Sequence, residues 1–285
     1  MKILVVFPNW LGDAIMAHGF VQALVQNYAS KIQSIHALAP AYLRDILNHM
    51  SEIQKSFESP VAHGKLNLSG ILKSSQALKQ EQYSHAYVLP NSWKSALIPF
   101  LAKIPKRIGW LGECRIGLLN DWRSLNQTKY PSMLSRFIAL AYEKGRLNFP
   151  LPYPKLLVNT EHRLLKSDQP ALAICPGAEF GPAKQWPARH FAKVAQHFLN
   201  RGYEVLILGN QKDAAIADNI QYLAPKIRNL AGKTTLEQAL IKLTQVQLVL
   251  SNDSGLMHLA AALQKPLVAI YGSTNSEFTP PFLPA

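Results

Sequence analysis

The sequence predicts an α/β fold made of two Rossmann-like halves. Short apolar runs alternate with amphipathic segments, which is the pattern of βαβ units around a parallel sheet. A proline-rich stretch at 147–154 interrupts this alternation, because prolines at alternate positions fit neither a helix nor a paired strand. Since the alternation then restarts, we expect two domains, 1–154 and 155–285, with a cleft between them.

The elements of the first half follow from apolar runs bounded by turn residues. Runs of four to eight apolar residues are typical of buried strands, and longer amphipathic segments are typical of helices. In chain order the expected elements are a strand at 3–7, a helix at 14–28, a strand at 32–39, a helix at 41–49, a strand at 86–89 and a helix at 94–102.

The second half repeats this alternation. Gly202 is expected to turn the chain from its first helix into its second strand. In order the expected elements are a strand at 171–175, a helix at 189–200, a strand at 204–208, helices at 213–223 and 236–244, a strand at 246–250, a helix at 255–263 and a strand at 267–270.

Composition and charge narrow the class of protein. With 48% hydrophobic and 16% charged residues, the 285-residue chain is globular rather than disordered or fibrous. No apolar stretch approaches the length of a membrane span, and the N-terminus lacks the apolar region of a signal peptide. Cys114 and Cys175 fit a reducing compartment, so we expect a cytoplasmic protein.

The net charge of +13 lies mostly in residues 1–150 and suggests an anionic partner. An inert basic surface explains the charge equally well. A nucleic-acid-binding module is a further alternative that rests on charge alone, since no nucleic-acid motif is found.

A first candidate segment, residues 7–13, leads from the first strand into the first helix. Gly12 allows a tight turn, and Asp13 lies where the free N–H groups of a helix favour an anion. Asp13 is interpreted either as a helix cap or as an ionised carboxylate that accepts a proton. The segment is not GxGxxG, so the dinucleotide fingerprint is absent.

A second segment, residues 175–187, leaves the first strand of the second half. Gly177 and Gly181 open its backbone and Lys184 follows, an arrangement that suits a diphosphate. An exposed loop with a surface lysine is the alternative.

A third segment, residues 251–258, joins a strand to a helix. Asp253 is interpreted as an acceptor of hydrogen bonds from sugar hydroxyls or as a plain N-cap. Ser254 and Gly255 would open the helix N-terminus to a ligand, and His258 is either functional or packed. No D-x-D, HExxH or Cys/His cluster is present, so the sequence supports no metal site.

These segments carry a resemblance to a known family. The stretches PNWLGDAIM (8–16), YVLPNSWKSALIPF (87–100), RIGWLGECRIGLLND (107–121), CPGAEFGPAKQWP (175–187) and NDSGLMHLAAAL (252–263) resemble the ADP-heptose:lipopolysaccharide heptosyltransferases of glycosyltransferase family 9, most closely those of type II. The resemblance implies a GT-B fold, in which domain 1–154 binds the acceptor and domain 155–285 binds the donor. It also implies members that continue beyond Ala285, so we expect an incomplete C-terminal domain.

The resemblance further implies an inverting transfer of heptose from ADP-heptose to the inner-core heptose of lipopolysaccharide, without metal or other cofactor. Asp13 falls at the position of the family's general base. The positions implied for the donor are Gly177, Lys184, Asp213, Asp253, Ser254, Gly255 and His258. Those implied for the acceptor are Asn9, Trp10, Lys94, Arg107, Arg115 and Arg123.

The expected partners are ADP-heptose and heptosyl-Kdo-lipid A, with peripheral contact to the cytosolic face of the inner membrane. We expect no nucleic acid partner and a monomer. A type I heptosyltransferase, another ADP-sugar transferase and an inactive nucleotide-sugar-binding remnant remain alternatives.

Overall fold

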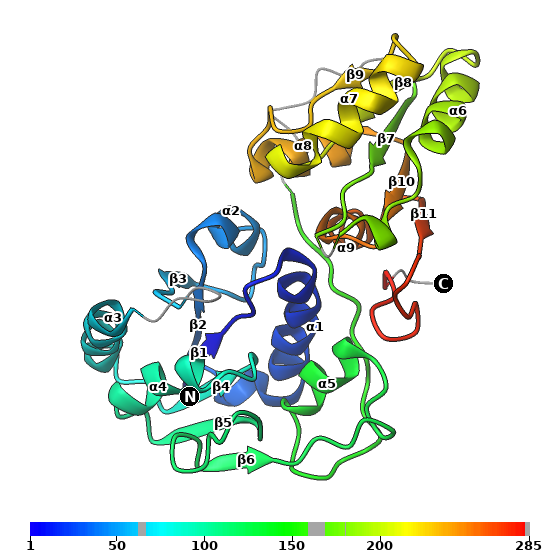
Figure 1. Ribbon diagram of the computed structural model, residues 1–285. Coiled ribbons are helices and arrows are strands. Elements are labelled where there is room, and N and C mark those ends of the chain that lie inside the picture. The colour runs from blue at the N-terminus through cyan, green and yellow to red at the C-terminus, as the bar shows by residue number, and fades with distance from the viewer. Residues whose placement is uncertain (62–66, 159–168, 180, 283–285) are drawn as a thin grey trace. The chain divides into compact units, whose positions relative to one another are not determined.

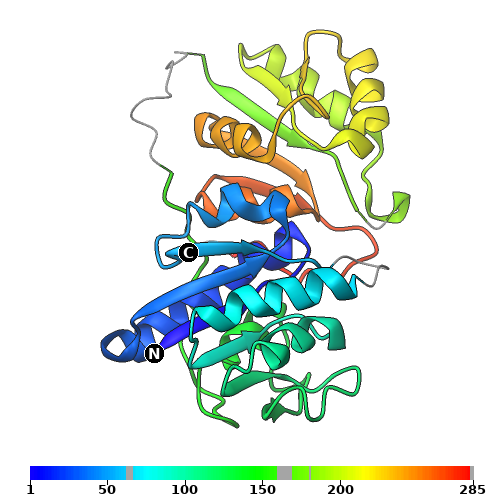
Figure 2. The ribbon, with the colours of Figure 1, turned by 90° about the vertical axis from the view of Figure 1, so that its left-hand side faces the viewer.

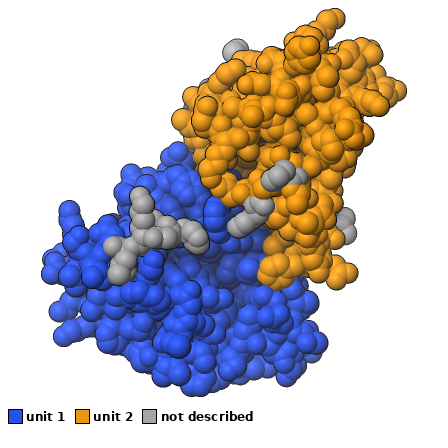
Figure 3. Space-filling model, viewed as in Figure 1, with its two compact units in different colours: residues 1–154 blue, residues 155–285 orange. Residues whose placement is uncertain are grey.

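The computed structural model describes residues 1–61, 67–158, 169–179 and 181–282. The chain divides into two compact units, Met1–Pro154 and Lys155–Ala285, coloured blue and orange in Figure 3. Each unit contains a parallel β-sheet and helices, so the predicted α/β class with two Rossmann-like units is confirmed. Within the described part of the chain, no helix combines the length and apolar character needed to cross a membrane.

Unit 1 is built on a six-stranded sheet in the order β3-β2-β1-β4-β5-β6. All of its ladders are parallel, so the strands end at one edge of the sheet. The strands are β1 (Lys2–Val6), β2 (Ser34–Ala39), β3 (Lys55–Glu58), β4 (His85–Val88), β5 (Lys106–Trp110) and β6 (Asp121–Arg123). The central strand β1 is apolar and buried from Ile3 to Val6, as expected for a strand covered on both faces.

Helices cover both faces of this sheet (Figures 1 and 2). They are α1 (Leu11–Tyr28), η1 (Ala29–Lys31), η2 (Ala41–Leu43), α2 (Arg44–Leu47), α3 (Leu68–Gln80), α4 (Trp93–Leu101) and α5 (Met133–Ala139). Helix α1 packs against α5, and α3 packs against α4. Leu4 and Val6 form a core cluster with Ile71 of α3 and Ile98 of α4, because alternate side chains of a strand face the same side.

Unit 2 contains a five-stranded parallel sheet in the order β11-β10-β7-β8-β9. Its strands are β7 (Ala171–Cys175), β8 (Glu204–Ile207), β9 (Arg228–Asn229), β10 (Leu248–Asn252) and β11 (Leu267–Ile270). Its helices are η3 (Pro182–Lys184), α6 (Ala188–Leu199), η4 (Gln211–Asp213), α7 (Ala214–Leu223), α8 (Leu236–Gln245) and α9 (Gly255–Ala262). The core cluster joins Leu172 and Ile207 of the sheet to Phe191 of α6 and Ile220 of α7.

Most predicted elements lie within a few residues of the observed ones, and the strands at 171–175 and 267–270 have the predicted bounds. Helix α1 starts three residues earlier than predicted, and the helix at 41–49 is a 3-10 turn followed by the short α2. The strand expected at 246–250 lies at Leu248–Asn252. The prediction missed β3, α3, β5, β6, α5 and β9.

Candidate functional site

The predicted donor-binding residues of unit 2 gather where its central strands end. In a parallel sheet all carboxyl ends share one edge, and ligands bind beyond that edge. Residues 176–179 follow β7, residues 208–213 follow β8, and Asp253 follows β10. These three strands are neighbours in the order β10-β7-β8, so the sheet brings the three sequence segments together.

A buried ion pair links two of these segments. Lys184 Nζ lies 3.0 Å from Asp253 Oδ2, and the two side chains are 15% and 8% exposed. The hydroxyl group of Thr274, which follows β11, donates to the same carboxylate oxygen at 2.7 Å. Asp253 therefore accepts from a cation and from a hydroxyl group. Sequence reasoning missed Thr274, because a single threonine after a strand forms no recognisable pattern.

The loop that carries Lys184 is held by the last residue of β10. Asn252 Nδ2 donates to the carbonyl oxygen of Pro176 at 2.7 Å, and the Trp186 N–H donates to Asn252 Oδ1 at 3.1 Å. The Asn252 side chain is fully buried and bonded at both of its polar atoms. This asparagine thus fixes both ends of the glycine-bearing loop relative to Asp253.

The N-terminus of α9 is capped by Ser254, whose hydroxyl oxygen accepts the Met257 N–H at 3.4 Å. The interpretation of Asp253 as the N-cap is therefore wrong, and its carboxylate serves the ion pair instead. Gly255 is the first residue of α9 and follows Asp253 by two residues in the sequence. The helix dipole and the ammonium group of Lys184 favour an anion here.

Asp213 lies against two glycines at the ends of β7 and β8. A Cβ atom at Gly177 would come within 2.5 Å of the Asp213 carboxylate, and one at Gly209 within 2.9 Å. The carboxylate accepts the Asn210 N–H at 2.9 Å. Burial raises the pKa of the Asp213 carboxyl above its ordinary value, which this hydrogen bond opposes. Gly177 is therefore required by close packing against Asp213.

His258 lies on α9 and is buried. Burial lowers its pKa to about 4, an effect that the nearby Asp253 carboxylate opposes and Lys184 reinforces. The imidazole is thus neutral at physiological pH and adds no second positive charge beside Lys184, and its role toward the donor stays a prediction.

In unit 1, Asp13 occupies the third position of α1, directly beyond the carboxyl end of β1. Trp10 is the N-cap residue and its side chain makes no capping hydrogen bond, so the alternative in which Asp13 is the helix cap is not met, although Asp13 does lie in the first turn of α1. Asp13 is half-buried and Trp10 is exposed. The Tyr42 hydroxyl donates to the carbonyl oxygen of Asn9 and holds this turn.

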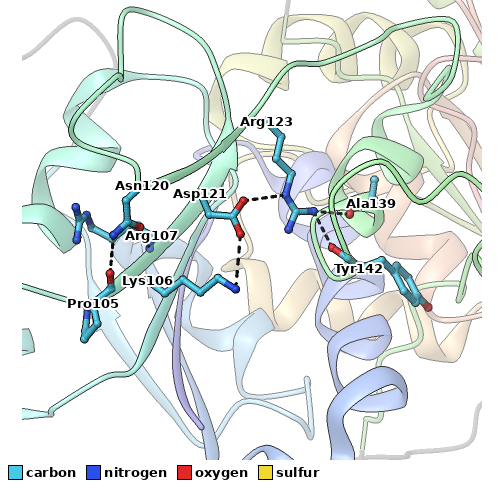
Figure 4. Close-up of polar contacts among 8 residues, drawn as sticks. All are labelled: Pro105, Lys106, Arg107, Asn120, Asp121, Arg123, Ala139 and Tyr142. Carbon is cyan, nitrogen blue, oxygen red and sulfur yellow. Dashed lines mark hydrogen bonds and ion pairs between the residues drawn. The ribbon is translucent and has the colours of Figure 1, made fainter.

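Three of the predicted acceptor contacts are arginines whose side chains bind the protein's own carbonyl groups. Arg123 Nη1 donates to the carbonyl oxygens of Ala139 (3.0 Å) and Tyr142 (2.8 Å), and its Nε lies 3.5 Å from Asp121 (Figure 4). Arg107 donates to the carbonyl oxygens of Leu118 and Ile104.

Arg115, the third of these arginines, is completely buried and donates to the backbone carbonyls of Pro90, which lies after β4, and of Trp110, the last residue of β5. Burial lowers the pKa of its guanidinium to about 10, so it remains charged at neutral pH. The structure gives all three guanidinium groups structural contacts, and their role toward an acceptor stays a prediction. Lys94 lies half-buried in the first turn of α4.

Among the residues that the structure describes, no group of three or more His, Cys, Asp and Glu side chains could hold a metal ion. The candidate site of unit 2 instead offers a lysine and a helix N-terminus as its positive elements.

Comparison with known proteins identifies relatives along almost the whole chain. The profile of glycosyltransferase family 9 (heptosyltransferase) matches residues 71–284. Lipopolysaccharide heptosyltransferase 2 of Salmonella typhimurium is 43% identical, with 99% of this chain and 85% of that protein covered. Lipooligosaccharide heptosyltransferase 2 of Haemophilus influenzae is 41% identical, with 99% and 86% covered. The structure of E. coli ADP-heptose lipopolysaccharide heptosyltransferase II superposes with a TM-score of 0.90 at 40% identity, covering 99% of this chain and 88% of that one.

Proposed function

The chain belongs to glycosyltransferase family 9, and from this membership we propose the function of a type II lipopolysaccharide heptosyltransferase. Such an enzyme transfers heptose from ADP-heptose to the inner-core heptose of lipopolysaccharide. The relatives at 41–43% identity that carry the type 2 name favour this step over the type I step.

The observation that carries the donor assignment is the Lys184–Asp253 pair beside the N-terminus of α9. A diphosphate needs positive charge and N–H donors, and Lys184 and the first turn of α9 supply both. Asp253 can then accept hydrogen bonds from the donor sugar. Asp253 is the ion-pair partner of Lys184 in the structure, so a bound diphosphate would compete with this carboxylate for the ammonium group.

Asp213 and Gly177 are proposed to take the nucleoside part of the donor. Because Gly177 has no side chain, the Asp213 carboxylate can lie against its backbone at the ends of β7 and β8, the edge at which ligands of a parallel sheet bind. A carboxylate accepts two hydrogen bonds from vicinal hydroxyl groups, such as those of a ribose.

Asp13 is proposed as the general base. A hydroxyl oxygen of the acceptor heptose attacks the anomeric carbon of the donor and gives its proton to the Asp13 carboxylate. The bond from that carbon to the diphosphate oxygen breaks, and ADP leaves with the electron pair from the opposite face, which inverts the configuration. A carboxylate is a sufficient base because the hydroxyl becomes acidic as its oxygen bonds to an oxocarbenium-like carbon.

Lys184 and the N-terminus of α9 would stabilise the charge that develops on the leaving ADP. Because protein groups provide this charge in the proposal, transfer is expected to continue in excess chelator.

The basic character of the chain fits an acceptor that carries carboxylates and phosphates at a membrane surface. We propose that the protein meets this acceptor at the cytosolic face of the inner membrane. Acceptor binding is then expected to weaken as salt is raised.

The function is tested by incubating the protein with ADP-heptose and following the mass of two acceptors, Kdo-lipid A and monoheptosyl-Kdo-lipid A, in buffer with EDTA. The proposal predicts a gain of one heptose on the monoheptosyl acceptor. A gain on Kdo-lipid A alone would assign the type I step, and no gain on either acceptor would contradict heptosyl transfer.

A further inference from the structure

The loops that follow β4 and β5 are tied together by one buried guanidinium group. Arg115 is 0% exposed, and it donates to the carbonyl oxygens of Pro90 and Trp110 and, at 3.3 Å, to Asn91 Oδ1. Pro90 and Asn91 follow β4, and Trp110 ends β5. Arg115 Nε has no hydrogen-bond partner within the described residues, so one N–H donor of this buried guanidinium group is left without a hydrogen bond.

The loop that delivers Arg115 has an unusual backbone. Glu113 and Cys114 both lie in the left-handed region, with φ of 42° and 53°. Non-glycine residues rarely adopt this conformation, and they keep it only where surrounding contacts enforce it. The contacts here are those of Arg115 and of the Glu113 carboxylate, which accepts the Trp93 N–H at 3.0 Å. Such conformations cost energy and cluster at functional sites.

These contacts converge on Asn91. A Cβ atom at Gly112 would lie 3.3 Å from Asn91 Cβ and from its carbonyl oxygen, so the two loops are in close contact. Arginine can only donate hydrogen bonds, so the Asn91 atom that faces it must be the carbonyl oxygen of the amide. The NH2 group of the exposed Asn91 side chain therefore points away from the guanidinium.

The position of Asn91 in the sheet places it next to the segment that leads to Asp13. Strands β1 and β4 are neighbours, and the Leu89 N–H donates to the carbonyl oxygen of Val6 at the ends of both strands. Adjacent strands are about 4.8 Å apart. The loop carrying Asn91 and the turn carrying Asp13 thus leave the same sheet edge side by side.

We propose that Asn91 binds the acceptor sugar by donating its amide N–H to a hydroxyl oxygen, and that Arg115 is the positioning residue that fixes the orientation of this amide. The assignment rests on the proposed function. Asp13 can only accept a hydrogen bond while ionised, and Asn91 adds the complementary donor for a neighbouring hydroxyl group. Arg115 acts in this way through Asn91 and does not touch the acceptor.

The test compares Asn91→Asp and Asn91→Ala with the control variant Gln76→Glu, which makes the same amide-to-carboxylate change on the exposed surface of α3. Initial rates are measured with varied de-acylated monoheptosyl-Kdo-lipid A at saturating ADP-heptose, and then with varied donor. Asn91→Asp keeps an oxygen toward Arg115 but loses the donor. Both Asn91 variants are expected to raise the acceptor KM about tenfold or more, with the ADP-heptose KM unchanged and Gln76→Glu like the wild type.

Arg115→Lys tests whether Arg115 positions the Asn91 amide. It is expected to raise the acceptor KM without changing the donor KM, and the thermal unfolding curve checks that the variant is folded. Titration of the same acceptor without donor measures binding independently of turnover, and it should show the same loss in the Asn91 variants.

Acceptor KM values and acceptor affinities of the Asn91 variants within twofold of the wild type would refute the assignment of Asn91 while heptosyl transfer stands. A wild-type protein that binds the acceptor but transfers no heptose would refute the proposed function, whereas the binding comparison would still decide the role of Asn91.

Discussion

Replacing Lys184 should weaken ADP binding, whereas replacing its partner Asp253 should not. The two groups are 3.0 Å apart and largely buried, with Thr274 as a second donor to the carboxylate. Lys184→Met removes the ammonium group proposed to bind the diphosphate. Asp253→Asn removes the charge that competes with the diphosphate for Lys184, while the amide oxygen can still accept from Thr274.

The expected magnitudes follow from the strength of hydrogen bonds to charged groups, about 1.5–3 kcal/mol. Since 1.4 kcal/mol corresponds to a factor of about ten, Lys184→Met should weaken ADP binding about 10- to 100-fold. Asp253→Asn should leave ADP affinity unchanged or up to about tenfold tighter, and it should abolish the extra affinity that the heptose of ADP-heptose provides.

Isothermal titration with ADP and with ADP-heptose measures both effects at fixed salt. Lys193→Met, which removes an exposed lysine on α6, is the matched control. Wild-type ADP affinity in Lys184→Met would refute the diphosphate role of this lysine. Weakening of ADP binding by Asp253→Asn as large as that by Lys184→Met would refute the competition between carboxylate and diphosphate.

Three further predictions concern the same unit. Gly177→Ala places a methyl group 2.5 Å from the Asp213 carboxylate. This clash should lower the unfolding free energy of unit 2 by about 1–3 kcal/mol and weaken ADP binding. An unchanged midpoint of urea unfolding would contradict this packing. Thr274→Val should lower the steady-state rate of heptosyl transfer about tenfold. Thr274→Ser keeps the hydroxyl donor to Asp253 and should stay near the wild-type rate. A Thr274→Val rate equal to that of the wild type would exclude a role for this hydroxyl group. Burial lowers the pKa of His258 from its ordinary value of 6.5 to about 4, so between these pH values the unfolded state binds more protons than the folded state. The unfolding free energy should therefore rise from pH 4 to pH 6.5 by on the order of 3 kcal/mol. Denaturation of His258→Asn across this window should show a flatter dependence of stability on pH.

Elements with a continuous apolar run and clear boundaries could be predicted from the sequence. Strand β7 is apolar throughout and β11 lies between Pro266 and Tyr271, so the pattern gave their bounds. Strand β6 has only three residues, of which the first, Asp121, and the last, Arg123, are charged, and its existence depends on pairing with β5. The buried face of α3 consists of Ile71, Ser75 and Leu78, so a serine interrupts the apolar pattern that would have marked this helix.

The shift of β10 has a specific physical reason. Ser251 and Asn252 are polar and were expected to lie in a loop, yet both are fully buried strand residues. Asn252 pairs with Ile270 through the backbone and satisfies its side chain with Pro176 and Trp186. Polar residues whose partners come from distant segments cannot be assigned to a strand from local sequence.

The segments that form the candidate site were recognisable, but the partners of single side chains were not. Glycine-bearing turns after strands predicted a ligand site at these segments, and both Lys184 and Asp253 were predicted to belong to it. Their direct contact, and the hydroxyl of Thr274 beside them, depends on the strand order β11-β10-β7. The burial of Arg115 could not be predicted either, because an arginine within a polar loop is usually exposed, and only the tertiary structure shows this one to be buried.

The central claim, that the Asp13 carboxylate takes the proton in heptosyl transfer, is tested most directly by the single-turnover rate of Asp13→Asn with monoheptosyl-Kdo-lipid A. Asparagine preserves the size of this side chain in the first turn of α1 but cannot accept the proton. The proposal predicts transfer at least about 100-fold slower than in the wild type, with unchanged ADP affinity. Transfer near the wild-type rate in this variant would contradict it.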